Sequence, residues 1–142
     1  MRNSIYLSLI ALSLIVIPLC EADLWVPDTY PTIQDAVDAA ATGDIIWVRD
    51  GTYTGTGNRG IELGGLDITV RSENGPTTTV IDLESSSTGF LFNGTTERST
   101  VVQGFTIING SRFYGGAMAM SDNASPTIRD CVFLNNSATT AG

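Results

Sequence analysis

The sequence contains no histidine and no lysine, so its seven basic residues are all arginines, against fifteen Asp and Glu residues. Without histidine, a nucleophile in this chain would lack the residue that usually serves as its base. The net charge of −8 argues against a nucleic acid or an anionic membrane surface as partner, because both require a basic patch. Such an acidic balance instead favours solubility of an exported protein.

Cysteine is also scarce, since only Cys20 and Cys131 are present. Cys20 lies in the apolar N-terminal segment, and removal of that segment would leave Cys131 alone. No disulfide could then form within the remaining chain. Cys131 aligns with an apolar position of the preceding repeat, which predicts a small core residue rather than a nucleophile.

Residues 1–22 have the features of a secretory signal peptide. Arg2 precedes an apolar run over residues 5–19, and Cys20-Glu21-Ala22 ends on a small residue that suits cleavage. An uncleaved spanning helix is the alternative, but the run is shorter than the ~20 apolar residues that a bilayer core requires. We therefore expect cleavage after Ala22, which leaves one domain over residues 23–142 and no transmembrane helix.

Two segments near the end of the chain repeat one another without a gap. Residues 101–110, VVQGFTIING, match residues 127–136, TIRDCVFLNN, at an offset of 26 (128 − 102). An apolar segment precedes each of them, and residues 89–92 match residues 116–119 at an offset of 27 (116 − 89). Self-similarity at such a period indicates stacked repeats, because one unit cannot bury its apolar face without a neighbour.

Within each repeat, the side chains alternate with the period of a strand. Phe105 and Ile107 fall on one face, as do their counterparts Cys131 and Phe133. Short strands with turns rich in Gly, Asn, Ser and Thr predict a parallel β-helix, in which each strand pairs with its copy one coil later. Phe133 is then expected to point inward, so that Phe133→Asp would abolish cooperative folding of a suitably capped chain.

The repeat resembles that of the polymorphic outer-membrane proteins, whose units carry Gly-Gly-Ala-aliphatic and Phe-x-x-Asn. In this chain those motifs are Gly115-Gly116-Ala117-Met118 and Phe133-Leu134-Asn135-Asn136. From about residue 26 to residue 142, the chain resembles the right-handed parallel β-helix proteins of the pectin-lyase-like superfamily. This resemblance implies an all-β, right-handed β-solenoid that is secreted or on the cell surface, with the outer membrane as one location.

The segment before the first coil has the apolar spacing of a helix rather than that of a strand. Thr32 and Asp35 form a capping-box pattern, apolar residues recur at helical spacing from Ile33 to Ala41, and Gly43 stands at an expected C-cap. This opening is similar to that of pectin-lyase-like chains, in which a short helix covers the open end of the first coil. We expect an N-terminal cap at about 23–43 and coils over 44–142, with strands at 45–48, 60–63, 66–71 and 79–83.

The repeat register also bears on the end of the sequence. It carries Gly115 onto Ala141 and Gly116 onto Gly142, where another strand is expected to begin. Stacked repeats need about three units and a polar terminal cap. We therefore expect this chain to be the N-terminal piece of a longer protein.

No catalytic, cofactor-binding or metal-binding residue is assigned from the sequence. β-helix enzymes use, as families, an Arg or Lys base beside calcium-binding carboxylates, or clustered aspartates. Arg71 and Arg129 are candidate bases, but a lone surface arginine is usually solvated or ion-paired. The aspartates of the coils are each single in the sequence: Asp67, Asp82, Asp122 and Asp130.

Four Asn-x-Ser/Thr triplets begin at Asn93, Asn109, Asn123 and Asn135. They would accept glycans only in a eukaryotic secretory route. Asn109 and Asn135 align, which predicts a ladder of side-chain amides that hydrogen-bond from coil to coil.

Two hypotheses of function follow from these observations. The first is an exported, non-enzymatic repeat protein that is adhesin-like or glycan-binding, with a polysaccharide or a cell-surface glycan as partner and no cofactor. The second is the N-terminal part of a polysaccharide-active enzyme, similar to the pectate lyases, whose site lies in further coils. We prefer the first, because fold alone does not assign chemistry and the residues present form no catalytic set.

Overall fold

The computed structural model describes residues 22–140. The expected signal peptide, apart from Ala22, and the expected repeat position at residues 141–142 lie outside this range. The described part contains one helix, α1 (Ile33–Ala39), and fourteen strands. The strands are β1 (Asp23–Val26), β2 (Ile45–Val48), β3 (Gly51–Tyr53), β4 (Ile61–Glu62), β5 (Thr69–Ser72), β6 (Thr79–Asp82), β7 (Phe90–Phe92), β8 (Val101–Gln103), β9 (Thr106–Ile108), β10 (Ser111–Arg112), β11 (Met118–Met120), β12 (Thr127–Arg129), β13 (Val132–Leu134) and β14 (Ser137–Ala138).

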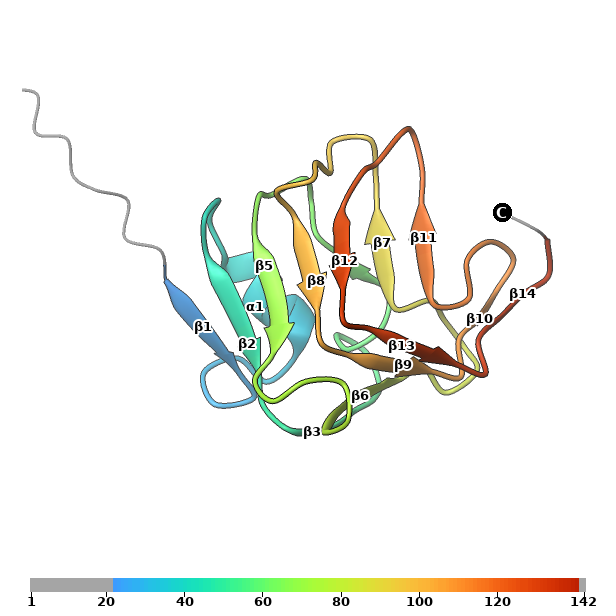
Figure 1. The fold of residues 1–142 in the computed structure, drawn as a ribbon, viewed down its shortest axis with the longest axis horizontal. Helices are drawn as coiled ribbons and strands as arrows, with labels where there is room; N and C mark the ends of the chain where they lie inside the picture. The colour runs from blue at the N-terminus through green and yellow to red at the C-terminus, as the bar shows by residue number, and fades with distance from the viewer. Residues whose placement is uncertain (1–21, 141–142) are drawn as a thin grey trace, which may run out of the picture.

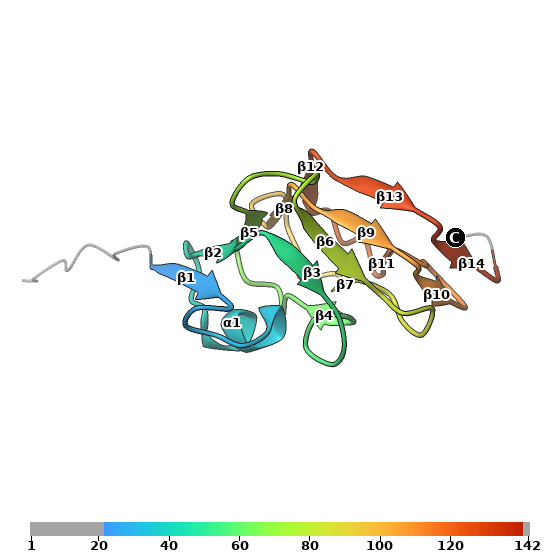
Figure 2. The ribbon, with the colours of Figure 1, turned by 90° about the horizontal axis from the view of Figure 1, so that it is seen from below.

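These strands form four parallel sheets that run along one stack of coils. Sheet A has the order β1-β2-β5-β8-β12, sheet B β3-β6-β9-β13, sheet C β4-β7-β11 and sheet D β10-β14. Figure 1 shows sheet A from β1 to β12, and Figure 2 shows the strands of sheet B side by side. The all-parallel β-solenoid has about four turns, which confirms the predicted fold class of a right-handed parallel β-helix.

The coils differ in length, and this explains why only the last part of the chain reads as a repeat. Along sheet A, Asp23 pairs with Ile45, Ile45 with Thr69, Thr69 with Val101 and Val101 with Thr127. The offsets are therefore 22, 24, 32 and 26 (45 − 23, 69 − 45, 101 − 69, 127 − 101). A search at one fixed period finds only the last of these steps.

Inward-facing side chains stack in apolar columns between the sheets. In sheet B, Tyr53 pairs with Ile81 and Ile81 with Ile107, and all three are buried. Burying one such side chain completely contributes about 1.5–3 kcal/mol, so each coil adds to the core of its neighbours. The corresponding column of sheet A consists of Leu24, Ile46, Val70 and Val102.

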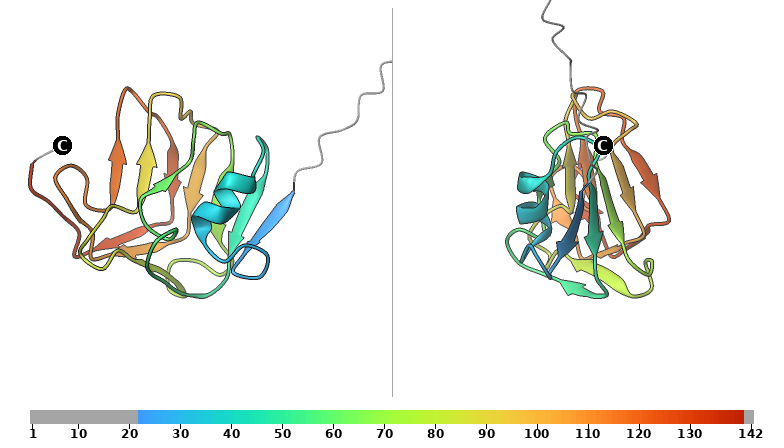
Figure 3. Two further views of the ribbon diagram at one scale, coloured as in Figure 1. Left: turned by 180° about the vertical axis from the view of Figure 1, so that it is seen from behind. Right: turned by 90° about the vertical axis from the view of Figure 1, so that its left-hand side faces the viewer.

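Helix α1 covers the core at the end of the stack that carries β1, as seen along the stack in Figure 3 (right). Its buried side chains are those of Ile33, Ala36 and Val37. The N-cap of the predicted capping box is confirmed, since the Thr32 hydroxyl oxygen accepts a hydrogen bond from the Asp35 backbone N–H at 3.2 Å and donates to the Asp35 carboxylate. The apolar columns are therefore shielded from water at this end.

The same helix also closes the edge of sheet C, where β4 is the outermost strand. The Gln34 side-chain oxygen accepts from the Glu62 N–H at 2.9 Å, and its amide nitrogen donates to the Glu62 carbonyl at 3.2 Å. One glutamine thus makes the two bonds that a further strand would make, which protects an otherwise open strand edge.

Three details of the sequence-based prediction are wrong. The strand expected at 66–71 begins at Thr69 and ends at Ser72. The helix ends at Ala39 with Ala40 as C-cap, rather than at Gly43, because Ala40 is extended and the Ala41 N–H bonds to the Asp44 carboxylate. In sheet C, Met118 pairs with Phe90 at an offset of 28 (118 − 90), not 27. The observed register keeps Met118 in the apolar column of Phe90, whereas a shift of one residue would turn it outward.

The inward position predicted for Phe133 is confirmed by its register, although the side chain is less buried than the rest of its column. Phe133 pairs with Ile107 and so continues the inward column of sheet B, as expected. However, it lies in the last described coil and is 45% exposed, whereas Ile107 is 0% exposed. Other apolar side chains of this coil are exposed as well, including those of Val132 and Leu134. A charge at Phe133 therefore remains in contact with water.

We predict that Ile107→Asp removes cooperative thermal unfolding, because the charge would be buried between two coils at a cost above about 4 kcal/mol. Phe133→Asp should cost less than about 1.5 kcal/mol, since water reaches that position. Circular dichroism melting of both variants measures the difference, with Val132→Asp as a control on the outward face of β13. Equal losses for Ile107→Asp and Phe133→Asp would contradict the assignment.

Candidate functional site

The aspartates that the sequence singles out lie apart, and most of them bond to uncharged partners in a neighbouring coil. Asp67 accepts from the Ser99 hydroxyl, and Asp130 accepts from the Gln103 amide at 3.0 Å. Asp82 accepts from the Asn109 amide at 3.0 Å and from the Glu84 N–H at 2.9 Å. These carboxylates are thus held in structural hydrogen bonds between coils. Asp122 stands in an exposed turn with φ 53°.

Asn109 and Asn135 are turn residues of left-handed conformation, with φ of 57° and 56°. Among the hydrogen bonds of residues 22–140, none joins their side chains, so the expected amide ladder is not formed there. Its place is taken by the Asn109–Asp82 bond and by Asn136, whose side chain accepts from the Gly110 N–H and donates to the Ile107 carbonyl. Amide bonding from coil to coil is present, but between other residues.

Arg71 and Cys131 both pack against other parts of the fold rather than facing a catalytic partner. The Arg71 guanidinium lies over the Trp47 ring at 4.4 Å, and its Nε is buried without a hydrogen-bond partner. Cys131 is half-buried against the core, as expected, and burial raises the pKa of its thiol. Arg129 is exposed and stands in register with Gln103. None of these arginine and cysteine side chains meets a carboxylate in a catalytic arrangement.

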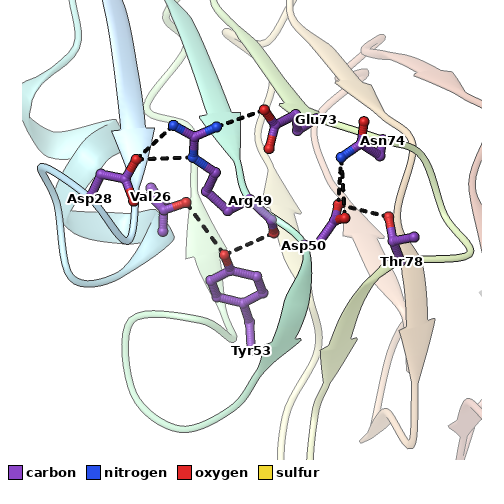
Figure 4. A network of polar contacts seen from close by, with 8 residues as sticks. All are labelled: Val26, Asp28, Arg49, Asp50, Tyr53, Glu73, Asn74 and Thr78. Carbon is purple, nitrogen blue, oxygen red and sulfur yellow. Dashed lines mark hydrogen bonds and ion pairs between the residues drawn. The ribbon is translucent and has the colours of Figure 1, made fainter.

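A polar corner joins the first three coils, as Figure 4 shows. The Arg49 guanidinium contacts the Asp28 carboxylate at 2.8 Å and the Glu73 carboxylate at 2.6 Å. Asp50 accepts in the same way from the Asn74 amide and the Thr78 hydroxyl of the next coil. All these charges have partners, so the corner links coils rather than presenting an unpaired group to a ligand.

An aromatic stack adjoins this corner on the outer face of sheet A. Trp25 and Trp47 are in register, with ring centroids 5.4 Å apart and planes inclined by 11°. Arg49 lies over the Trp25 ring at 4.0 Å, and Arg71 lies over Trp47. The indole faces are therefore engaged with one another and with arginines, a favourable arrangement that stabilises the N-terminal coils. It leaves little ring surface for a ligand.

The outer face of sheet C differs, because it has an aromatic ring that is open to solvent. Tyr114 is 62% exposed and follows β10 in the loop that leads to β11. Beside it lies a hollow of ≈ 390 Å³, and two adjoining hollows share Tyr114 and Ala119 with it. We call this region the Tyr114 groove and define it by Glu62, Leu91, Asn93, Tyr114, Ala119 and Ser121.

The floor of the Tyr114 groove is formed by one outward column of sheet C. Glu62, Leu91 and Ala119 occupy equivalent positions of β4, β7 and β11. Asn93 and Ser121 follow the last two strands and add an amide and a hydroxyl. An apolar floor, an aromatic side and a few polar groups are the usual components of a site for a small organic ligand.

Sequence reasoning missed the aromatic stack and the groove for different reasons. The stack could have been found, because Leu24-Trp25-Val26 and Ile46-Trp47-Val48 repeat the same pattern at an offset of 22 (47 − 25). The groove could not, because Tyr114 belongs to a connecting loop and has no counterpart in the repeat.

Within residues 22–140, no group of three or more His, Cys, Asp and Glu side chains is arranged to hold a metal ion. Over the same range, no helix is long and apolar enough to cross a membrane. Comparison with protein-family models, curated proteins and solved structures finds no match for this chain. The candidate site therefore rests on its own geometry.

We predict that Trp47→Ala lowers the free energy of unfolding by about 2 kcal/mol, because it removes the contacts with Trp25 and Arg71. Tyr114→Ala should change it by less than about 0.5 kcal/mol, because that ring is mostly solvated. Urea denaturation of both variants provides the measurement. A larger loss for Tyr114→Ala would assign that ring a structural role instead.

Hydrogen bonds from the Glu84 N–H and the Asn109 amide hold the pKa of Asp82 below its ordinary value. Its contribution to stability is therefore complete above the unfolded pKa of about 3.9 and is lost as the pH falls through the lower folded pKa. We expect Asp82→Asn to flatten the decline of the unfolding free energy below about pH 4. Denaturant titrations from pH 7 to pH 2 compare the slopes, and parallel curves would contradict this expectation.

Proposed function

We propose that this protein is an exported, non-enzymatic β-solenoid that binds glycan in the Tyr114 groove. The observation that carries the proposal is the open Tyr114 ring beside a hollow with hydrogen-bonding side chains on sheet C. Sugars present apolar C–H faces and a rim of hydroxyls, which match a ring face together with amide, carboxylate and hydroxyl groups. The two tryptophans, by contrast, are already stacked.

Export and surface location are supported by the sequence of residues 1–22 and by the repeat motifs. We also propose membership of the pectin-lyase-like superfamily, with a repeat related to that of polymorphic outer-membrane proteins. The motifs Gly115-Gly116-Ala117-Met118 and Phe133-Leu134-Asn135-Asn136 support this relationship.

The competing proposal, a polysaccharide-active enzyme, requires a pair of carboxylates or an arginine beside carboxylates at one place. In the described coils, Asp82 and Asp130 each bond to an amide of the neighbouring coil. Arg49 does meet Asp28 and Glu73, but in closed ion pairs at a corner of the stack. Within residues 22–140 these carboxylates are therefore engaged in contacts between coils, and the enzyme proposal places its site in further coils.

The proposal predicts that residues 23–142 bind oligosaccharides on a glycan array and that Tyr114→Ala weakens the best interaction at least about tenfold, or 1.4 kcal/mol. Isothermal titration calorimetry measures the affinity. Tyr114→Phe should bind within about threefold of the original protein, because the ring face is retained. Val132→Ala, at an exposed apolar position of β13, serves as control.

Two outcomes would overturn the proposal. One is an array on which the folded protein binds no glycan. The other is glycan binding that Tyr114→Ala leaves unchanged, which would place the binding surface elsewhere on the solenoid.

A further inference from the structure

The charge of the Tyr114 groove points to the class of sugar that it recognises. Glu62 is the one charged side chain among the residues that line the first hollow, and it is exposed. Of the ion pairs described within residues 22–140, none involves Glu62, since these join Arg49 to Asp28 and Glu73 and Arg59 to Glu84. Its carboxylate is therefore available to a cationic group of a ligand.

The backbone of Glu62 is held in place although its side chain is exposed. Both its N–H and its carbonyl bond to the Gln34 side chain, at 2.9 and 3.2 Å. The neighbouring inward residue, Ile61, is fully buried. The Glu62 side chain thus projects from a backbone position that the cap holds in sheet C.

Two further features attract the same charge. The electron-rich face of an exposed tyrosine binds cations, and Tyr114 borders the hollow that Glu62 lines. The chain as a whole carries a net charge of −8, which raises the local concentration of cationic ligands and repels anionic ones. Arg112 lines the second hollow, and it is not among the residues that line the first.

We propose that the first hollow of the Tyr114 groove binds a protonated amino sugar, with the ammonium group at the Glu62 carboxylate and the sugar ring against Tyr114. This inference rests on the proposed glycan binding and adds the substrate class. A glycan of uronic acids would place its carboxylates against Glu62 and is excluded by like-charge repulsion. A neutral glycan would contact the Tyr114 ring but would make no ion pair with Glu62.

Three tetrasaccharides of similar size separate these cases: one of glucosamine, one of N-acetylglucosamine and one of galacturonate. We expect the glucosamine tetramer to bind at least about tenfold more tightly than the acetylated one at pH 6, and the galacturonate tetramer not to bind. The preference should shrink as salt is raised from 20 to 500 mM, because the site is exposed and the ion pair is screened. Calorimetry on residues 23–142 measures each affinity.

The variant Glu62→Gln tests whether the Glu62 carboxylate binds the ammonium group. It keeps the shape of the side chain and the backbone bonds to Gln34, so the melting temperature should not change. We expect it to weaken the glucosamine tetramer about tenfold and to leave the acetylated tetramer within about twofold. The matched control is Glu97→Gln, which removes an exposed carboxylate that does not line the groove.

The outcomes distinguish this inference from the proposed function. If the acetylated tetramer binds as tightly as glucosamine and depends on Tyr114, or if Glu62→Gln has no effect, the amino-sugar inference is wrong and glycan binding stands. If no tetramer or array glycan binds in a manner that depends on Tyr114, both fail. If Glu97→Gln weakens glucosamine as much as Glu62→Gln, the attraction is due to net charge and Glu62 is not the determinant.

Discussion

In-register stacking of parallel strands is the constraint on which the rest of this structure depends. Each coil satisfies its backbone by bonding to the coils before and after it, at the ≈ 4.8 Å spacing of paired strands. Equivalent side chains are therefore forced into columns, whatever their type. Apolar columns such as Tyr53, Ile81 and Ile107 become the core. Polar side chains next to the columns bond from coil to coil, as Asp82 does to Asn109, the residue that follows its register partner Ile108.

In-register stacking leaves the first coil with unpaired backbone groups on one side, because no coil precedes its outermost strands. The chain covers this side with α1 and with the Gln34 amide, which bonds to both backbone groups of Glu62. A side chain that imitates a strand closes the edge of sheet C without adding another coil. It also holds the residue whose carboxylate borders the Tyr114 groove, so the cap and the candidate site share one contact.

The sequence predicted what depends on local pattern and missed what depends on coil length. Short sequence patterns predicted the N-cap at Thr32, the strand at 45–48 and the offset of 26 between β9 and β13, and all three are confirmed. The offset between Phe90 and Met118 was wrong by one residue. The connection from β7 to β8 has eight residues (93–100), whereas the connection from β11 to β12 has six (121–126). An insertion in a turn changes the offset between paired residues of successive coils. The alternation of apolar and polar residues within a strand does not reveal that change.

The aromatic residues differ in whether neighbouring side chains cover their rings. Trp25 and Trp47 lie on successive strands, so stacking brings their faces together at 5.4 Å and arginines cover them. Tyr114 comes from a loop, where no register supplies a partner above or below, and it meets Phe113 edge to face, with 87° between the planes. In a solenoid, a residue within the register is usually engaged by its neighbours. Residues in the irregular connections remain available for recognition, and the proposed glycan site accordingly lies beside the β10–β11 loop.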